Sequence, residues 1–187
     1  MKSVLISIQP KWCELIASGK KTVEVRKTKP KLETPFKCYI YCTIDGGVKG
    51  DMLVRSKLIC GKVIGEFVCD WVVGTCPWRL KGKTGFCAKR TEKETNLPNM
   101  ACLTLEEIEQ YAGHEGRGIY GWHISDLVIY DKPRELSEFR TPCKMGERLC
   151  GLCDYAVHGM DGDLIDCNTS LTRPPQSWCY VESEDTE

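Results

Sequence analysis

The chain has 187 residues, of which 42% are hydrophobic and 28% are charged. This is the composition of one globular domain, and it excludes a disordered or fibrous chain. Its 26 basic and 26 acidic residues balance, but residues 1–90 carry a net charge of +11 and residues 91–187 a net charge of −11.

The N-terminal residues predict a strand, a helix and a second strand. Apolar and polar side chains alternate over residues 3–9, which is typical of a half-buried strand. Pro10 favours the first turn of a helix, and Gly19 favours its end. The alternation then returns over residues 22–26 and predicts the second strand.

Four further segments are rich in β-branched and aromatic residues and predict strands: residues 37–43, 59–70, 120–130 and 177–182. Residues 74–100 show no period, so we expect a long loop with at most one short element. A capping box at Thr104 predicts a helix through Tyr111. Many short strands with a few short helices predict an α+β fold built on a small, mixed, partly closed β-barrel.

Two features bear on where the protein works. The longest apolar run near the start, Val4 to Ile6, is too short for a signal peptide or a membrane span. We therefore expect a cytoplasmic protein without membrane contact. Its polarised charge favours an anionic partner such as nucleic acid, unless the two halves neutralise each other in the fold.

Two phosphate-binding motifs are excluded by their context. Residues 116–121 match G-x-G-x-x-G, but a turn precedes them and a strand-like run follows. The dinucleotide fingerprint requires a strand before it and a helix after it. Gly82-Lys83-Thr84 resembles the end of a phosphate-binding loop, but Pro77 stands where that loop requires glycine. We expect no dinucleotide cofactor.

Thirteen cysteines are many for a protein in a reducing compartment, and their spacing predicts a metal site. A C-x2-C turn places two thiolates on one tetrahedral ion, and two more distant sulfurs close the site. The surrounding segment is poor in apolar residues, so a structural zinc ion would account for its order. His158 and Cys179 are alternative fourth ligands, and scattered free cysteines are the alternative to a metal. The predicted ligands are Cys143, Cys150, Cys153 and Cys167.

A polar cluster follows the predicted first helix. Strand alternation places Thr22, Glu24 and Arg26 on one face, where the carboxylate can pair with the guanidinium. With Lys20 and Lys21 nearby, the cluster can bind a phosphate or the polar edge of a base, or activate a lysine in a partly buried cleft. The alternative is an exposed, salt-bridged strand face.

Three tryptophans near the basic half, Trp12, Trp71 and Trp78, are candidates for stacking on bases. Trp78 lies among basic residues in PWRLKGK and is the better candidate. Trp12, on the predicted first helix, we expect in the core.

Gly19, Lys21, Glu24 and Arg26 reproduce the G-x-K-x-x-E-x-R signature of the ASCH domain, a member of the PUA-like superfamily. The segment ISIQPKWCELIASGKKTVEVRKTKP resembles the family's strand–helix–strand opening. Later segments resemble a branch frequent in bacteria and their phages: GKVIGEFVCD, LTLEEIEQYAG, GWHISDLVIYDKPREL and RPPQSWCYVE.

The resemblance divides the chain into three parts. It implies an ASCH, PUA-like barrel domain over residues 1–140, and the cysteine spacing predicts a Cys-rich, zinc-binding insertion over residues 141–172. Residues 173–187 then supply the final barrel strand and an acidic tail.

The resemblance also implies a cleft that is proposed to bind RNA or modified nucleosides. Some family members resemble amidohydrolases that remove the acetyl group from N4-acetylcytidine, and others have been assigned ribonuclease activity. In the acetylcytidine branch the lysine matching Lys21 is catalytic, with threonine at the position of Glu24 and a distant glutamate. The candidates for that glutamate are Glu92, Glu94, Glu106 and Glu107.

Three functional hypotheses follow. The first is a protein that binds RNA or a modified nucleoside in a Lys21–Glu24–Arg26 cleft. The second is an amidohydrolase on the same cleft, with Lys21 and Glu24 as catalytic residues. The third is a protein-interaction or regulatory module that works through its acidic residues 91–187. The expected ligand-binding residues are Lys20, Lys21, Thr22, Glu24, Arg26 and Trp78.

Overall fold

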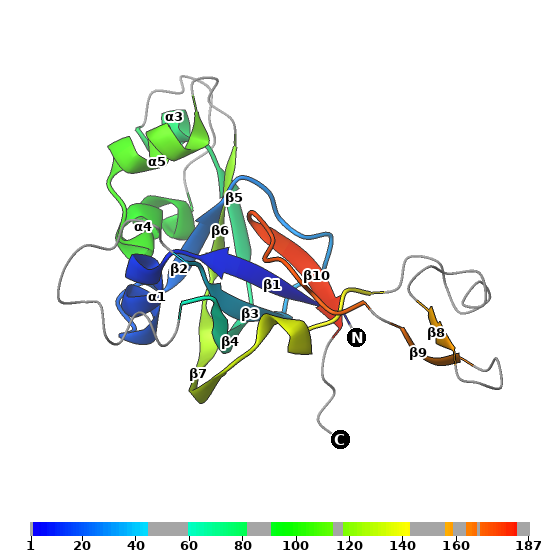
Figure 1. Ribbon diagram of the computed structural model, residues 1–187. Helices are drawn as coiled ribbons and strands as arrows, with labels where there is room; N and C mark the ends of the chain where they lie inside the picture. The colour runs from blue at the N-terminus through cyan, green and yellow to red at the C-terminus, as the bar shows by residue number, and fades with distance from the viewer. Residues whose placement is uncertain are drawn as a thin grey trace.

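Two β-sheets and several short helices form the body of the protein (Figure 1). The computed structural model describes residues 2–44, 60–81, 91–113, 118–142, 156–158, 164–167 and 169–182. Among the described helices, none is long and apolar enough to cross a membrane.

The larger sheet has five strands, and the smaller sheet has three. The larger contains, in spatial order, β10 (Trp178–Glu182), β1 (Lys2–Ile8), β3 (Phe36–Cys42), β4 (Lys62–Cys69) and β7 (Ser125–Arg134). All its neighbours are antiparallel except β1 and β3. The smaller sheet is antiparallel and contains β2 (Val23–Arg26), β6 (Ile119–His123) and β5 (Val72–Thr75). A separate hairpin, β8 (Ala156–His158) and β9 (Leu164–Cys167), lies to one side (Figure 1).

The helices are short, and their ends follow from local sequence. Helix α1 (Pro10–Ala17) begins at a proline, as does α3 (Pro77–Leu80). Helices α4 (Glu92–Ala101) and α5 (Leu105–Ala112) each begin with a complete threonine–glutamate capping box. A 3-10 turn, η1 (Leu136–Glu138), follows β7.

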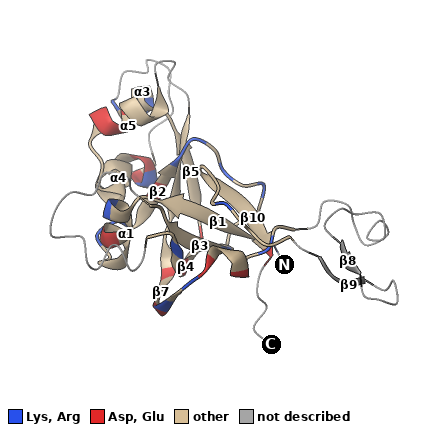
Figure 2. Ribbon diagram, viewed as in Figure 1, with Lys and Arg blue, Asp and Glu red and all other residues tan. Residues whose placement is uncertain are grey.

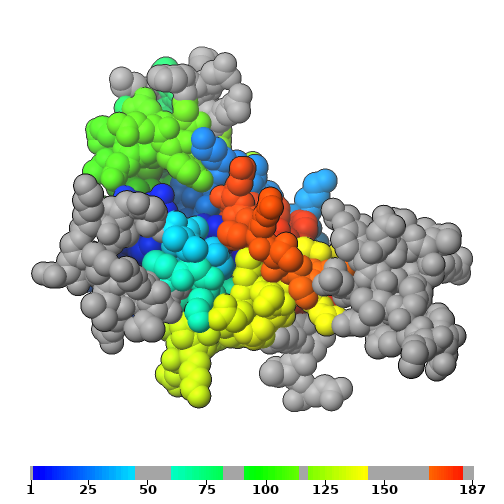
Figure 3. All heavy atoms as spheres, in the orientation of Figure 1, coloured from blue at the N-terminus to red at the C-terminus, as the bar shows by residue number. Residues whose placement is uncertain are grey.

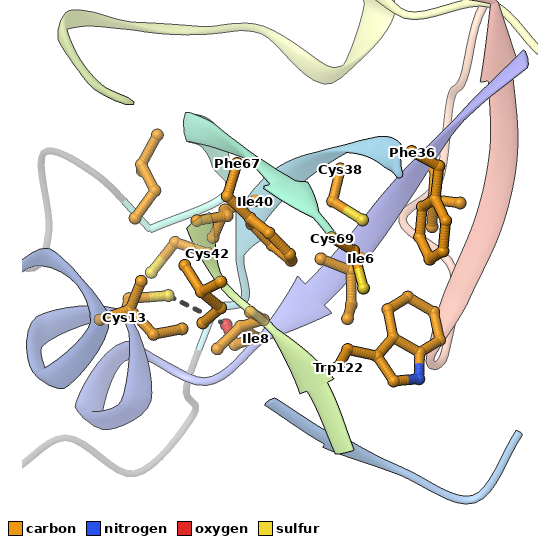
Figure 4. Packing of buried hydrophobic residues seen from close by; sticks show 14 residues of the cluster. Ile6, Ile8, Cys13, Phe36, Cys38, Ile40, Cys42, Phe67, Cys69 and Trp122 are labelled. Atoms are coloured by element: carbon orange, nitrogen blue, oxygen red, sulfur yellow. Dashed lines mark hydrogen bonds between the residues drawn. The ribbon is translucent and has the colours of Figure 1, made fainter. Parts of the chain in front are cut away.

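The buried hydrophobic side chains of the described residues form three clusters, one of which lies between the two sheets. Its residues come from β1, β3 and β4 of the larger sheet, from α1, and from Trp122 on β6 (Figure 4). Trp122 is fully buried, and its ring packs edge-on against Phe36. The second cluster joins β2 to α4 and α5, and the third covers the outer face of the larger sheet around Tyr39 and Phe139. The first helix and both sheets thus meet at the end of β1.

The α+β class is confirmed, but the arrangement of the strands differs from the expected barrel. The five-stranded and three-stranded sheets pack together but do not close into one barrel. Strand β1 is buried on both faces, where alternation predicted one polar face. Ser3 is 1% exposed and Leu5 is 0% exposed, because the first core cluster covers one face of this sheet and the third cluster covers the other.

Two segments differ from their sequence predictions. Residues 120–130 form parts of two strands, because β6 and β7 belong to different sheets and separate at Ile124. Strand β7 runs through Pro133 to Arg134, which is possible because an edge strand tolerates a missing N–H. Residues 74–100 contain the end of β5, α3 and most of α4 rather than a loop with one short element.

Candidate functional site

A cavity of about 790 Å³ opens where the two sheets approach the helices. In the space-filling view, the surfaces of α4 and α5 and of the segment before β10 lie on one face, with N-terminal residues between them (Figure 3). The cavity is lined by Ser7, Ile8, Gln9, Lys11, Trp12, Lys21, Glu24, Val25, Arg26, Thr43, Leu103, Glu107, Gln110, Tyr111, Pro174, Pro175, Gln176 and Ser177.

Three charged side chains form a buried triad in the wall of this cavity. Lys21 is 2% exposed, Glu24 6% and Arg26 8%. One oxygen of the Glu24 carboxylate lies 3.3 Å from Lys21 Nζ, and the other lies 3.1 Å from Arg26 Nη2. The cluster is therefore not an exposed strand face. A single carboxylate holds two cations, which leaves the triad with one net positive charge.

The position of Lys21 follows from the end of α1. Gly19 adopts a φ of +72°, which lets the chain reverse so that the N–H groups of Lys20 and Lys21 both reach Leu15 O. Lys21 Nζ then donates a 2.7 Å hydrogen bond to Ala101 O, the last carbonyl of α4. A cation is favoured at this negative end of a helix dipole, so Lys21 also holds α4 against the sheet.

Arg26 connects the two sheets. Its Nη2 donates a 2.5 Å hydrogen bond to Ser7 O at the end of β1, while its backbone pairs with Tyr120 on β6. Burial raises the pKa of Tyr111 on α5, and the neighbouring Arg26 guanidinium partly offsets that rise. Arg26 thus lies between β1, β2 and α5 at the cavity wall.

Both cations retain hydrogen-bonding capacity. Among the described residues, two acceptors engage Lys21 Nζ, and an ammonium carries three N–H donors. The buried Arg26 Nε has no hydrogen-bond acceptor among these described residues. A buried donor without a partner is costly, so these atoms favour a ligand that supplies acceptors.

Aromatic rings with nearby lysines border the triad. The ammonium groups of Lys11 and Lys21 lie 4.2 Å and 5.0 Å from the centroid of the Trp12 ring. Lys27 Nζ lies 5.2 Å from the Tyr111 ring. Both rings line the cavity, so a flat ligand between them would meet π-faces and positive charge.

Comparison with known proteins identifies the family. The model of the ASCH domain matches residues 6–131, which is more than half of the chain. The chain belongs to the ASCH family. Family members are proposed to bind RNA, and their fold is PUA-like.

Solved ASCH structures resemble this chain at low identity. A crystal structure of ASCH from Zymomonas mobilis is 19% identical, with a TM-score of 0.49, covering 97% of this chain and 89% of that one. Two mutants of the Zymomonas mobilis protein are each 18% identical. Their TM-scores are 0.44 and 0.43, with 97% and 96% of this chain and 91% and 88% of theirs covered. No match was found among the curated proteins.

The structure brings together half of the expected ligand-binding residues of this ASCH domain. Lys21, Glu24 and Arg26 line the cavity, whereas Lys20, Thr22 and Trp78 do not. Lys20 points to solvent from the turn after α1, and Trp78 is 53% exposed on α3. Thr22 donates its backbone N–H to Met100 O and so helps to hold α4.

The four candidate glutamates differ in whether they reach the cavity. Glu107 on α5 lines the cavity, whereas Glu92, Glu94 and Glu106 do not. Glu94 is 3% exposed, and its carboxylate lies 2.9 Å from Arg79 Nε. Trp12, which we expected in the core, is partly buried against it and also lines the cavity. Cavity residues that the sequence did not predict include Tyr111, Gln110 and residues 174–177, because their approach to the triad depends on tertiary packing.

The predicted zinc site cannot be placed by its side chains. Cys143, Cys150 and Cys153 lie outside the described residues, and Cys167 ends β9, where only the backbone is described. Within the described ranges, no group of three or more His, Cys, Asp or Glu side chains is arranged to hold a metal ion.

Proposed function

We propose that the cavity binds one unpaired nucleotide of an RNA, or a modified nucleoside, through the Lys21–Glu24–Arg26 triad. The observation that carries this proposal is a buried triad of two cations and one carboxylate in the wall of a cavity of about 790 Å³. Ligand-binding cavities usually measure ~300–1,000 Å³ and combine an apolar lining with a few convergent polar groups.

The groups in the triad suit the edge of a nucleobase. Base edges present carbonyl and ring-nitrogen acceptors beside amino donors. A remaining N–H of Lys21 and the free N–H of Arg26 can donate to such acceptors, while Glu24 can accept from an amino group. Trp12 and Tyr111 offer π-faces for the base itself.

A basic segment continues from the cavity along the surface and supports an RNA rather than a free nucleoside alone. Lys27, Lys29 and Lys31 are exposed in the segment that follows β2 (Figure 2). Within the described residues, none of the three has an ion-pair partner, so they remain available to phosphates. Each phosphate contact would add ~0.7 to the slope of log affinity against log salt for a single strand.

Other charges of the two halves neutralise each other. Among the described residues, three ion pairs join a basic residue of residues 1–90 to an acidic residue of residues 91–187: Arg79–Glu94, Lys81–Glu109 and Lys62–Glu135. The acidic half is therefore partly occupied by internal pairing. This pairing disfavours the hypothesis that residues 91–187 act mainly as an acidic docking surface.

Paired aromatic substitutions test the proposal. Binding of a fluorescent single-stranded RNA would be measured by anisotropy at ~50 mM salt, where electrostatic contacts are strong. Tyr111→Ala removes a cavity ring from a side chain that is 37% exposed, and we expect affinity to fall about tenfold, as for the loss of one base stack. Trp78→Ala removes an exposed ring outside the cavity and should leave affinity unchanged. The reverse ranking of the two variants would contradict the proposal.

A second candidate function, hydrolysis of an acylated nucleoside, is supported by Glu107. This carboxylate and Lys21 line the same cavity. In such a reaction Glu107 takes a proton from water, whose oxygen bonds to the acyl carbon, and Lys21 donates a hydrogen bond to the developing oxyanion. Glu107 then returns this proton to the leaving nitrogen as the carbon–nitrogen bond breaks, which releases the carboxylic acid and the amino nucleoside.

Mass detection after incubation with a panel of acylated nucleosides tests this candidate. A deacylated product that disappears in Glu107→Gln but persists in the exposed control Glu106→Gln would support it. Absence of product with the parent protein across the panel would leave binding as the function of the cavity.

A further inference from the structure

Three cysteine side chains meet behind the cavity wall. They come from α1 (Cys13), from the last residue of β3 (Cys42) and from the turn before β4 (Cys60). The sulfurs of Cys42 and Cys60 are 3.9 Å apart, and Cys13 Sγ donates to Ile8 O at 3.6 Å. Figure 4 shows Cys13 on its helix facing Cys42 across the end of β1.

We propose that Cys42 and Cys60 form a peroxide-reactive dithiol that closes to an intramolecular disulfide. The backbone already holds the two residues together, because Gly61 N donates to Cys42 O at 2.8 Å and Cys42 pairs with Lys62 across β3 and β4. A disulfide has an S–S length of ~2.05 Å, so the sulfurs need to approach by roughly 2 Å. Side-chain rotation together with a small shift of the turn can provide this movement.

The thiols of Cys42 and Cys60 differ in their access to an oxidant and in their nucleophilicity. Cys60 is partly exposed, so a small oxidant can reach it, whereas Cys42 is 0% exposed. Hydrogen bonds from the thiols of Cys13 and Cys60 lower the pKa of Cys42 against the opposing effect of burial. Hydrogen bonding to Cys42 raises the pKa of Cys13, and burial adds to that rise. Cys60, the accessible thiol, therefore reacts with the oxidant first, and Cys42 is favoured as the thiolate that attacks in the second step.

The reaction takes two steps. The Cys60 thiolate attacks hydrogen peroxide, so that an S–O bond forms, the O–O bond breaks and hydroxide leaves. The Cys42 thiolate then attacks the sulfenic sulfur of Cys60, the S–S bond forms, and the S–O bond breaks with loss of a second hydroxide. With the two thiol protons, the products are one disulfide and two water molecules. Peroxide is reduced, and the two sulfurs are oxidised.

The disulfide would form directly behind the ligand cavity. Thr43 follows Cys42, lines the cavity, and donates its N–H to Ile8 O at 2.9 Å. Ile8 O also accepts from Cys13, so Cys42 moves within a packed wall shared by α1, β1 and β3. A disulfide between Cys42 and Cys60 also reduces the conformational entropy of the unfolded chain. The oxidised protein should therefore melt several degrees higher than the reduced protein.

Peptide mapping identifies the bond. Trypsin cleaves at Lys37, Lys49, Lys57 and Lys62, which places Cys60 in residues 58–62 and Cys42, with Cys38, in residues 38–49. The reduced full-length protein would be treated with an equimolar amount of hydrogen peroxide, alkylated and digested. We expect a cross-linked pair of these two peptides as the first disulfide to appear, together with the higher melting temperature.

Two variants and a control decide the assignment. Cys60→Ser changes a partly exposed side chain, and Cys42→Ala changes a buried one; both should lose the cross-linked pair and the shift in melting temperature. Cys76→Ser alters another partly exposed thiol, at the start of α3, and should retain both. A cross-link that persists in Cys42→Ala would assign the bond to Cys38 and overturn the proposal. Conversion of Cys60 to sulfinic acid, or its pairing with a different cysteine, would overturn it equally.

Discussion

Glu24→Gln removes the negative charge that lies between two buried cations. The carboxylate oxygens are 3.3 Å from Lys21 Nζ and 3.1 Å from Arg26 Nη2, and each of the three residues is less than a tenth exposed. At an effective dielectric constant of ~20, each of these attractions is roughly 5 kcal/mol before desolvation is subtracted. Glutamine keeps the shape of the side chain and an acceptor oxygen, but it leaves the cations to repel each other.

The expected loss of stability follows from this geometry. Removing one partner of a buried ion pair typically costs ~3–5 kcal/mol, because the remaining charge is buried without compensation. We therefore expect Glu24→Gln to lower the free energy of unfolding by about 3 kcal/mol. Urea titration followed by circular dichroism measures this difference, with the slope of the transition checked for change.

Glu135→Gln is the matched control, because it removes a carboxylate from an ion pair with Lys62 in which the Glu135 side chain is 59% exposed. Exposed pairs of this kind contribute ~0–1 kcal/mol. If Glu24→Gln unfolds within ~0.5 kcal/mol of the parent, or no more easily than Glu135→Gln, the triad is not a buried, mutually compensated cluster.

Three further predictions address Glu94 at the start of α4, the contact between β4 and β7, and the predicted zinc site. Burial raises the pKa of Glu94, but its capping threonine and a neighbouring guanidinium lower it by more, so the net direction is downward. The Glu94 carboxylate therefore stabilises the folded protein above the unfolded pKa of ~4.3, and this stabilisation is lost as pH falls through the folded pKa. We expect the melting temperature of Glu94→Gln to fall less steeply with acid than that of the parent. Gly65→Ala would place a Cβ 2.4 Å from Val128 O on the neighbouring strand, and melting should show a loss of ~1–3 kcal/mol. Elemental analysis after zinc-replete expression should find about one zinc per chain, with less in Cys150→Ser or Cys153→Ser.

Each of these predictions has a result that contradicts it. An unchanged pH profile in the Glu94 variant would mean that this carboxylate has the same affinity for protons in the folded and unfolded chain. Full stability of Gly65→Ala would place the two strands farther apart than the structure does; Gly74→Ala, whose Cβ would lie 3.3 Å from the ring of Tyr120, is the control. Well under one equivalent of zinc would leave the cysteines after residue 140 as free thiols.

Local patterns predicted the elements whose ends depend on their own residues. The first helix begins at Pro10, which fits a first turn, and ends before Gly19, which adopts a positive φ. The capping box at Thr104 predicted α5 for the same kind of reason. A second capping box, Thr91 with Glu94, begins α4 and was available in the sequence. Its helix was missed because Pro98 and several polar residues obscure the apolar period.

Burial was the part that local patterns could not predict. Alternation shows which residues share a face of a strand, but not whether another layer covers that face. Ser3 and Ser7 are buried because both faces of β1 are covered. Lys21 is buried for a different reason, since its ammonium reaches the end of a helix that lies 80 residues later in the chain.

The candidate site was predicted in its charged residues and not in its aromatic walls. The triad could be inferred because its three members lie within six residues of each other on one turn and one strand. Trp12 and Tyr111 come from two helices that approach only through tertiary packing. Trp78 had basic neighbours in sequence, but α3 carries it away from the cavity residues.

Photo-cross-linking of a single-stranded RNA followed by peptide mapping tests most directly whether the triad cavity is the ligand site. We expect adducts on the cavity aromatics, Trp12 and Tyr111, that decrease as salt is raised. These adducts should be lost in Arg26→Lys, which keeps the charge but not the guanidinium fork. Circular dichroism of that variant would confirm that it remains folded. Adducts confined to Trp78 or to residues 143–167, with the cavity peptides unmodified, would contradict RNA binding in this cavity.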